Sequence, residues 1–287
     1  MAPTCNIKWT GGQWDVGRIR IGTSGWVYRA WRGTFYPKGL VQRRELEHIS
    51  GLMGSVELNG SFYSLQRPSS YLAWAAQTPA DFTFAVKGGR FITHLKQLRD
   101  VETPLANFFA SGVLALEHKL GPFLWQLPPR TAYNPERLKT FFALLPRTTS
   151  AAADLAERHD ERLAEDRAWT TTDADRPLRH ALEVRHPTFL DPDFFDLLRA
   201  HDIALVVSHS AGTFTYVEDV TADFVYVRLH GSESLYVGSY SDAELDEWAA
   251  KIRGWATDRD VYVYFDNDTD AAAPHDAIRL AARLHTP

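Results

Sequence analysis

Apolar and polar positions along residues 18–284 follow two periods in turn, which predicts alternating strands and helices. Short runs rich in Val, Phe, Tyr and Leu are typical of buried strands, and the longer segments between them carry apolar residues at helical spacing. The predicted strands are Arg18–Gly22, Ser55–Leu58, Phe82–Lys87, Phe123–Leu127, Ala181–Val184, Ala204–Ser208, Phe224–Leu229 and Val261–Phe265.

Most connections between these strands predict a helix. The fourth connection is the longest, and it includes a second predicted helix, Ser150–Ala164, followed by a polar loop at Glu165–Arg179. The sixth connection, Ser210–Asp223, is short and poorly helical in pattern. The remaining predicted helices are Glu45–Met53, Ser69–Gln77, Pro104–Leu120, Pro135–Leu144, Asp193–His201, Ser241–Ala256 and Pro274–Leu284.

This order of elements predicts an α/β fold, a single (β/α)8 barrel of the TIM type over residues 18–287. A long helical crossover follows its fourth strand, and residues 1–17 form an N-terminal extension. A doubly wound open sheet is the alternative. The barrel is favoured because the last strand is also followed by a helix. In addition, the segment Gly22–Gly25 lacks the glycine spacing of a dinucleotide-binding turn.

Strand alternation predicts which side chains line the barrel. The apolar face of each strand should meet the helices, so the other face should point inward. The sixth strand is apolar on both faces, which leaves its orientation open and makes His209 a looser candidate. Active sites of this fold lie at the carboxyl ends of the strands, where we expect Glu57, Asn59, Lys87, Gln126, Glu183, Arg185, Arg228, His230 and Asp266.

Two explanations compete for these charged side chains. They can be structural ion pairs inside the barrel, such as Glu57 with Lys87 or Glu183 with Arg228. Burying charge costs free energy even in pairs, however, and nine polar groups at one end favour a functional pocket. Aromatic residues in the loops after the strands either pack these loops or stack on a ligand; they include Trp26, Tyr28, Phe62 and Tyr63.

Composition narrows the classes of partner. The 287 residues carry a net charge of −5, which disfavours general nucleic-acid binding because phosphate contacts require a basic excess. The single cysteine, Cys5, excludes a disulfide framework within the chain and a cysteine-based zinc site. No run is long and apolar enough to span a bilayer and no signal pattern begins the chain, so we expect a cytoplasmic protein. No sequence pattern indicates the oligomeric state.

Several ordered segments resemble a known family. They include Ile21-Gly22-Thr23-Ser24-Gly25-Trp26, Val56-Glu57-Leu58-Asn59, Phe84-Ala85-Val86-Lys87, Glu183-Val184-Arg185-His186, Arg228-Leu229-His230-Gly231 and Tyr264-Phe265-Asp266-Asn267. Over about residues 18–284 the chain resembles the family called domain of unknown function 72. The resemblance implies a barrel related to the TIM type, and the family's activity is unknown. Asp266 departs from the family pattern, where Asn is more usual, and adds an anion to the predicted site.

The first functional hypothesis is an enzyme that uses acid–base chemistry on a small anionic substrate, phosphorylated or carboxylated. Carboxylates in unlike environments and a histidine can divide the roles of acid and base, and we expect Glu57, Glu183, His230 and Asp266 to be catalytic. Arginine and lysine suit anion binding. The expected substrate-binding residues are Ser24, Trp26, Tyr28, Asn59, Phe62, Tyr63, Lys87, Arg90, His94, Gln126, Arg185 and Arg228. No cofactor is predicted.

Three alternatives remain open. A metal-dependent hydrolase or phosphodiesterase, related to barrel endonucleases, would take its ligands from Glu57, Glu183, His209, His230 and Asp266. The interleaved cations and the absence of an H-x-H or H-E-x-x-H motif argue against it. A non-catalytic barrel would bind a metabolite in the same pocket. A glycosidase would use Glu57 and Glu183 as its carboxylate pair.

Overall fold

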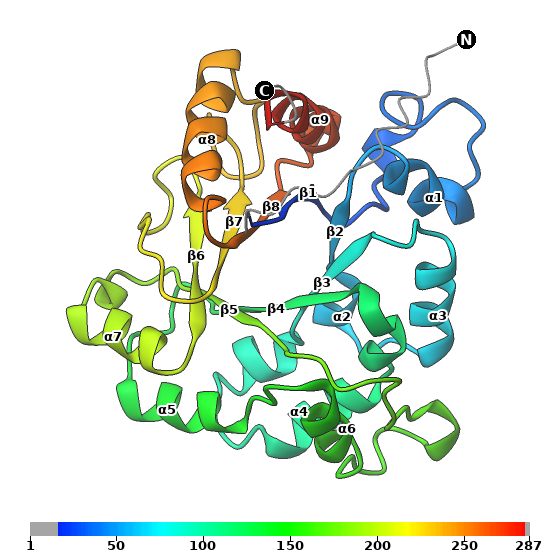
Figure 1. The fold of residues 1–287 in the computed structure, drawn as a ribbon, viewed down its shortest axis with the longest axis vertical. Helices are drawn as coiled ribbons and strands as arrows, with labels where there is room; N and C mark the ends of the chain where they lie inside the picture. The colour runs from blue at the N-terminus through cyan, green and yellow to red at the C-terminus, as the bar shows by residue number, and fades with distance from the viewer. Residues whose placement is uncertain (1–16, 285–287) are drawn as a thin grey trace.

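Eight parallel strands close into a barrel in chain order, with β8 paired to β1 (Figure 1). The computed structural model describes residues 17–284. The (β/α)8 architecture predicted from the sequence is therefore confirmed. The strands are β1 Ile19–Ser24, β2 Ser55–Leu58, β3 Thr83–Lys87, β4 Leu120–Gln126, β5 His180–Glu183, β6 Ile203–His209, β7 Phe224–Leu229 and β8 Asp260–Phe265.

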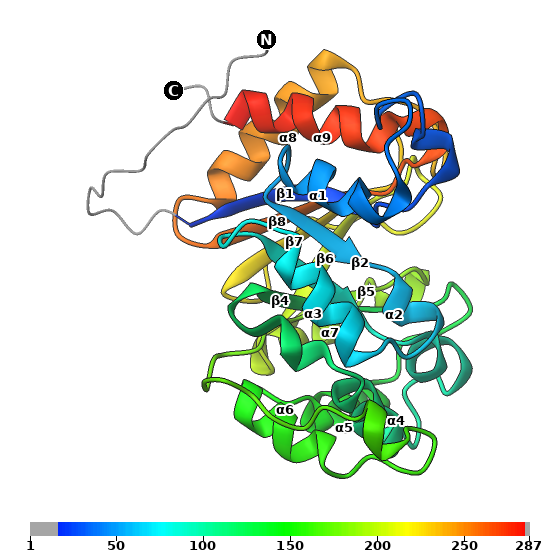
Figure 2. The ribbon, with the colours of Figure 1, turned by 90° about the vertical axis from the view of Figure 1, so that its right-hand side faces the viewer.

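Helices surround this barrel on its outer face, and α8 and α9 lie side by side over β8 and β1 (Figure 2). Among residues 17–284, no helix has the length and hydropathy needed to cross a bilayer. The α-helices are α1 Glu45–Ser50, α2 Gly60–Tyr63, α3 Pro68–Ala76, α4 Glu102–Ala110, α5 Pro135–Leu144, α6 Thr149–Ala156, α7 Pro192–Ala200, α8 Asp242–Trp255 and α9 Ala272–Leu284.

The predicted alternation of strand faces is confirmed by two separate buried clusters. The outer cluster, between strands and helices, includes the apolar positions of every strand. In β6, Leu205 and Val207 belong to the outer cluster, which settles the orientation that the sequence left open. His209 follows the same parity and so leaves the barrel. The inner cluster consists of Ala85, Leu124, Ala181, Ala204, Val206, Phe224, Tyr226, Tyr262 and Tyr264.

Two predicted helices are wrong in extent. The segment Pro104–Leu120 is not one helix, because α4 ends at Ala110 and Gly112 takes a φ of 112°. A Cβ at Gly112 would lie 2.6 Å from Cα of Pro68, so the tight approach of α3 requires glycine there. A 3-10 helix, Val113–Lys119, then leads into β4.

The second correction concerns the segment Ser150–Ala164, whose helix α6 ends at Ala156. Beyond α6 the chain is held against α4 by a reciprocal pair of hydrogen bonds. Asn107 donates from Nδ2 to Oδ1 of Asp160 at 2.8 Å, and its own Oδ1 accepts from the Asp160 backbone at 3.0 Å. This side-chain anchor fixes a turn where charge patterning suggested a helix. The sixth connection contains no helix, as predicted.

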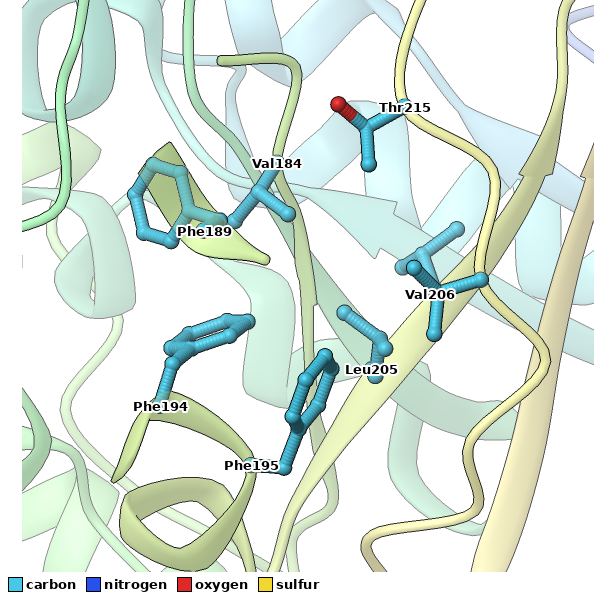
Figure 3. A pocket seen from close by; sticks show the side chains of 8 residues that line it. Val184, Phe189, Phe194, Phe195, Leu205, Val206 and Thr215 are labelled. Carbon is cyan, nitrogen blue, oxygen red and sulfur yellow. The ribbon is translucent and has the colours of Figure 1, made fainter. Parts of the chain in front are cut away.

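A small cavity of about 10 Å³ lies outside the barrel, between α7, β6 and the loop that follows β6 (Figure 3). Phe194, Phe195 and Leu205 line it together with other apolar side chains and Thr215. It holds no titratable group, so it is a packing space about the size of one water and offers no chemistry.

Candidate active site

A buried arginine organises the carboxyl ends of the strands. Arg228, at the end of β7, donates from Nη1 to Oε2 of Glu183 at 2.7 Å and from Nη2 to Oδ2 of Asp266 at 2.9 Å. It also binds Glu57 twice, from Nε at 3.1 Å and from Nη2 at 2.9 Å. Burial alone lowers the pKa of Arg228, but Glu57, Asp266 and Glu183 together raise it well above its usual range. The guanidinium therefore neutralises three carboxylates at once.

The strand register explains why these groups meet. Parallel pairing sets Ser24 of β1 beside Glu57 of β2, and Gln126 of β4 beside Glu183 of β5. Each of these side chains is on the inward face of its strand. The predicted convergence of polar groups from separate strands is present in the structure, and Arg228 joins groups from β2, β5 and the end of β8.

The carboxylate of Glu57 is fully occupied. Its Oε1 accepts from the Ser24 hydroxyl and from Arg228, and its Oε2 accepts from Arg228 and from Tyr226 at 2.7 Å. Asn59 in turn donates from Nδ2 to the Ser24 hydroxyl oxygen at 2.9 Å. Because four donors hold both oxygens of Glu57, its carboxylate is a fixed anchor with little freedom to reach a ligand.

Glu183 is held in a similar way. Its Oε1 accepts from Gln126 at 2.9 Å and from Arg185 at 2.8 Å, while its Oε2 accepts from Arg228. Burial raises the pKa of Glu183, but Arg185, Arg228 and His230 lower it by more than burial raises it. The pKa of Glu183 therefore lies well below its ordinary value. Glu183 is therefore a permanent anion and a weak base.

His230 lies between two carboxylates just beyond β7. Its Nδ1 is 2.9 Å from Oδ2 of Asp266, and its Nε2 is 3.7 Å from Oε1 of Glu183. Burial raises the pKa of Asp266, yet Arg228, His230 and Lys87 bring it down to about 2. The ring of Tyr236 covers His230 edge-on, with the ring centroids 5.6 Å apart. Oδ1 of Asp266 accepts no hydrogen bond within residues 17–284.

Lys87, at the end of β3, does not pair with Glu57, which was one of the two arrangements that the sequence allowed. Its side chain is 8% exposed, and its ammonium forms no hydrogen bond or ion pair in the described part of the chain. The ammonium instead lies 4.5 Å from the ring centroid of Phe62. Burial, followed by the charge of Arg228, lowers the pKa of Lys87 to about 8.

Asp268 belongs to the site, although the strand pattern did not single it out. It lies two residues beyond Asp266, so continuing the β8 alternation past the strand end would have found it. Burial, followed by the charge of Asp266, raises the pKa of Asp268 to about 8, and its Oδ1 is buried without a hydrogen-bond partner. Tyr28 packs beside it and donates its hydroxyl proton to the Ser24 carbonyl oxygen. Asp268 thus carries a proton at neutral pH.

Some of the candidate residues in the loops after β2 and β3 lie beside Phe62 and Lys87, and others lie at the surface. His94 meets the ring of Phe62 edge-on at 5.0 Å, and burial followed by the charge of Lys87 lowers the His94 pKa to about 4. Arg90 is at the start of the same turn, at the rim of the site. Tyr63 is 70% exposed and contacts Phe62 from outside.

Trp26, one of the expected substrate-binding residues, packs against Trp74 of α3, with ring centroids 5.6 Å apart. The loop after β1 thus uses Trp26 mainly to fix itself to the helix layer. Tyr28 of the same loop is the aromatic residue that reaches the polar centre.

One of the five ligands proposed for a metal ion, His209, lies away from the other four. His209 lies on the outer face of the barrel, where its Nδ1 contacts the Tyr240 hydroxyl at 2.8 Å and its ring packs against Trp248. The three carboxylates converge on the guanidinium of Arg228, which occupies the place of a cation. Within residues 17–284, no group of three or more His, Cys, Asp and Glu side chains is arranged to hold a metal ion.

Comparison with known proteins places the chain in a family. The UPF0759 protein YunF of Bacillus subtilis (strain 168) is 28% identical over 116 residues, which cover 39% of this chain and 40% of YunF, so less than half of that relative is matched. A DUF72 family protein from Thermotoga maritima has the same fold, with a TM-score of 0.72, 24% identity and coverage of 94% of this chain and 100% of that chain. One from Enterococcus faecalis V583 has a TM-score of 0.72 and 16% identity, covering 94% of this chain and 96% of that chain. The family model described as "Protein of unknown function DUF72" matches residues 20–287, and the chain therefore belongs to the DUF72 family.

Proposed function

We propose that this protein is an enzyme that applies acid–base chemistry to a small anionic substrate, a carboxylate or a phosphate ester, at the carboxyl ends of the strands. The observation that carries the proposal is a set of unpaired polar groups beside a fixed carboxylate network. Nη2 of Arg185 and Oδ1 of Asn59 are buried without a partner, and the Lys87 ammonium is unpaired among the described residues.

Arg185 and Lys87 are the proposed anion-binding groups. Arg185 is fixed by its Nε bond to Glu183 and by the ring of Phe214, 4.3 Å from its guanidinium carbon, while Nη2 remains unpaired. A buried donor without an acceptor costs about 1–3 kcal/mol, which an anionic oxygen would recover. Arg228, expected from the sequence to bind substrate, already donates from every nitrogen to the protein. Its proposed role is therefore to position the carboxylates.

The proposed acid and base therefore differ from those expected from the sequence. Hydrogen-bond donors occupy the carboxylate oxygens of Glu57 and Glu183, so the proposed role of these two residues is to hold Arg228 in place. Asp268 carries a proton up to a pH of about 8 and has a free oxygen, which makes it the proposed general acid. His230, whose Nδ1 lies 2.9 Å from Oδ2 of Asp266, is the proposed base. A metabolite-binding protein would need no proton-bearing carboxyl, and Asp268 is what favours an enzyme.

The test uses the purified protein with inorganic phosphate, glycolate and 2-phosphoglycolate as probes. We expect the anions to raise the melting temperature of the wild type and to lose this effect in R185M, while R199M, a surface arginine variant, behaves as the wild type. Equal stabilisation of R185M and the wild type, or stabilisation by none of the three anions, would overturn the anion site. Once a substrate is found, D268N should bind it and fail to turn it over; full turnover by D268N would overturn the assignment of the acid.

A further inference from the structure

Lys87 is a buried lysine whose ammonium forms no hydrogen bond and no direct ion pair within residues 17–284. Lysines removed from water are normally paired, because an isolated buried ammonium is costly. Lys119 illustrates the usual solution: it is buried as well, and it donates to the carbonyl oxygens of Ala75 and Thr78 at 2.6 and 2.8 Å. Lys87 lies instead over the Phe62 ring, at the end of the barrel where Asn59 and Arg185 also have free polar atoms.

The surroundings of Lys87 raise the fraction of neutral amine above that of an ordinary lysine. Burial and the nearby guanidinium of Arg228 bring its pKa to about 8, although Glu57, Asp266 and Glu183 partly offset them. About one amine in ten would be unprotonated at pH 7, against fewer than about one in a thousand for an ordinary lysine. His94, on the same Phe62 ring, adds no charge because its pKa is lowered to about 4. A neutral lysine in an apolar setting is a nucleophile towards carbonyl carbon.

We propose that Lys87 forms an imine with an aldehyde or ketone group of the anionic substrate, whose class is then a small oxo acid or a phosphorylated carbonyl compound. This inference deepens the proposed function and rests on it for the anion. Arg185 would hold the anionic group while the carbonyl carbon meets Nζ of Lys87.

The step balances without an oxidant or a reductant. The lone pair of Nζ attacks the carbonyl carbon, a C–N bond forms, and the carbonyl oxygen takes up a proton to give a carbinolamine. The nitrogen then loses one of its two protons to solvent or His230. The hydroxyl oxygen accepts a second proton, and the C–O bond breaks to release water. Asp268 is the nearby carboxyl that carries such a proton. The product is a protonated imine and one water molecule.

The first arm of the test uses formaldehyde with cyanoborohydride, which methylates lysines through an imine and needs no anion. Peptide mass spectrometry at pH 7 should find Lys87 modified at least tenfold faster than the exposed Lys38 and Lys139, and Lys119 unmodified. Lys87 reacting no faster than Lys38 would overturn the imine proposal. The absence of any methylation of Lys87 would also overturn the imine proposal, because a carbonyl compound larger than formaldehyde could not reach the amine either.

The second arm uses pyruvate and dihydroxyacetone phosphate with borohydride. A single adduct on the peptide that carries Lys87, absent in K87R and weakened in R185M, supports the proposal in full. In a second outcome, Lys87 reacts with formaldehyde and both anionic carbonyl compounds form adducts that R185M leaves undiminished. This result would overturn the anion site of the proposed function and would still support imine formation at Lys87. In a third outcome, phosphate binding depends on Arg185 but Lys87 is unreactive in both arms. This result would overturn the imine proposal and would leave the proposed function supported.

Discussion

Arg228 and Glu57 meet across the interior of the barrel through two hydrogen bonds, Nε to Oε2 at 3.1 Å and Nη2 to Oε1 at 2.9 Å. Their strands, β7 and β2, are not neighbours in the sheet. The pair therefore fixes the relative position of two strands that are separated by β8 and β1, and the same guanidinium also holds Glu183 and Asp266. The end of the barrel that carries the candidate site is rigid at its centre and has free polar atoms around it.

Replacing Arg228 by Met should remove this common counter-charge. The carboxylates of Glu57, Glu183 and Asp266 would stay buried without it, and we expect the free energy of unfolding to fall by about 3–5 kcal/mol. Urea denaturation at neutral pH measures the loss. The control is R199M, whose arginine pairs with Asp196 and Asp219 at the surface and should cost far less. Equal losses in the two variants would contradict a central role for Arg228.

Asp268 should make stability depend on pH in a specific direction. Its folded-state pKa, about 8, lies above the unfolded value, so the folded protein holds an extra proton between the two. The contribution is fully present below about pH 4 and is lost as the pH rises through 8. We expect D268N to flatten the fall in melting temperature between pH 5 and pH 9. The exposed D270N is the matched control, and an unchanged pH profile in D268N would refute the assignment.

Asp266 should act in the opposite direction. Its pKa in the folded protein is about 2, so its contribution to stability is complete above the unfolded value of about 4 and is lost as the pH falls through 2. D266N should therefore narrow the difference in unfolding free energy between pH 6 and pH 3. Chemical denaturation at the two values measures it, with the surface variant D219N as control. A difference as large as in the wild type would be inconsistent with a buried, ionised Asp266.

D266N should also change Lys87. The Asp266 carboxylate raises the pKa of Lys87, so its removal should lower that pKa further and leave more neutral amine at pH 7. Reductive methylation of Lys87 should then be several-fold faster in D266N, with Lys38 unaffected. A slower reaction would show that the two groups do not interact as the structure indicates.

Gly112 provides a test of the fold that is independent of the site. Its φ is 112°, and a Cβ added there would lie 2.6 Å from Cα of Pro68, so alanine cannot be accommodated without a backbone shift. We expect G112A to lower the unfolding free energy by about 1–3 kcal/mol. Gly254 in α8 has open space around it, so G254A should stabilise by about 0.5–1 kcal/mol. Thermal unfolding compares the two, and a neutral G112A would contradict the packing of α3.

The fold and the membership of the site followed from local patterns. Alternation along a strand is decided by neighbouring residues, and it correctly turned Glu57, Glu183 and Arg228 towards the interior. The division of roles among them depends on distances across the barrel, which no local pattern contains. The sequence pattern therefore predicted Arg228 to be a substrate-binding residue. It also allowed an ion pair between Glu57 and Lys87 that the structure does not form.

The errors have equally specific causes. Asp268 lies beyond the end of β8, where strand alternation no longer applies by rule. The pattern over Pro104–Leu120 predicted a single helix because it does not contain the backbone angle at Gly112, which only glycine tolerates well. His209 was left open because both faces of β6 are apolar, and it was the packing of Leu205 and Val207 against the helices that decided it.

A crystal structure of the protein grown with inorganic phosphate would test the proposed anion site at atomic detail. We predict a phosphate oxygen bonded to Nη2 of Arg185, with the Lys87 ammonium beside the anion and Arg228 still bound to Glu57, Glu183 and Asp266. A structure in which Lys87 is paired with a carboxylate, Nη2 of Arg185 is bonded to a protein acceptor, and the site holds no phosphate would contradict this prediction.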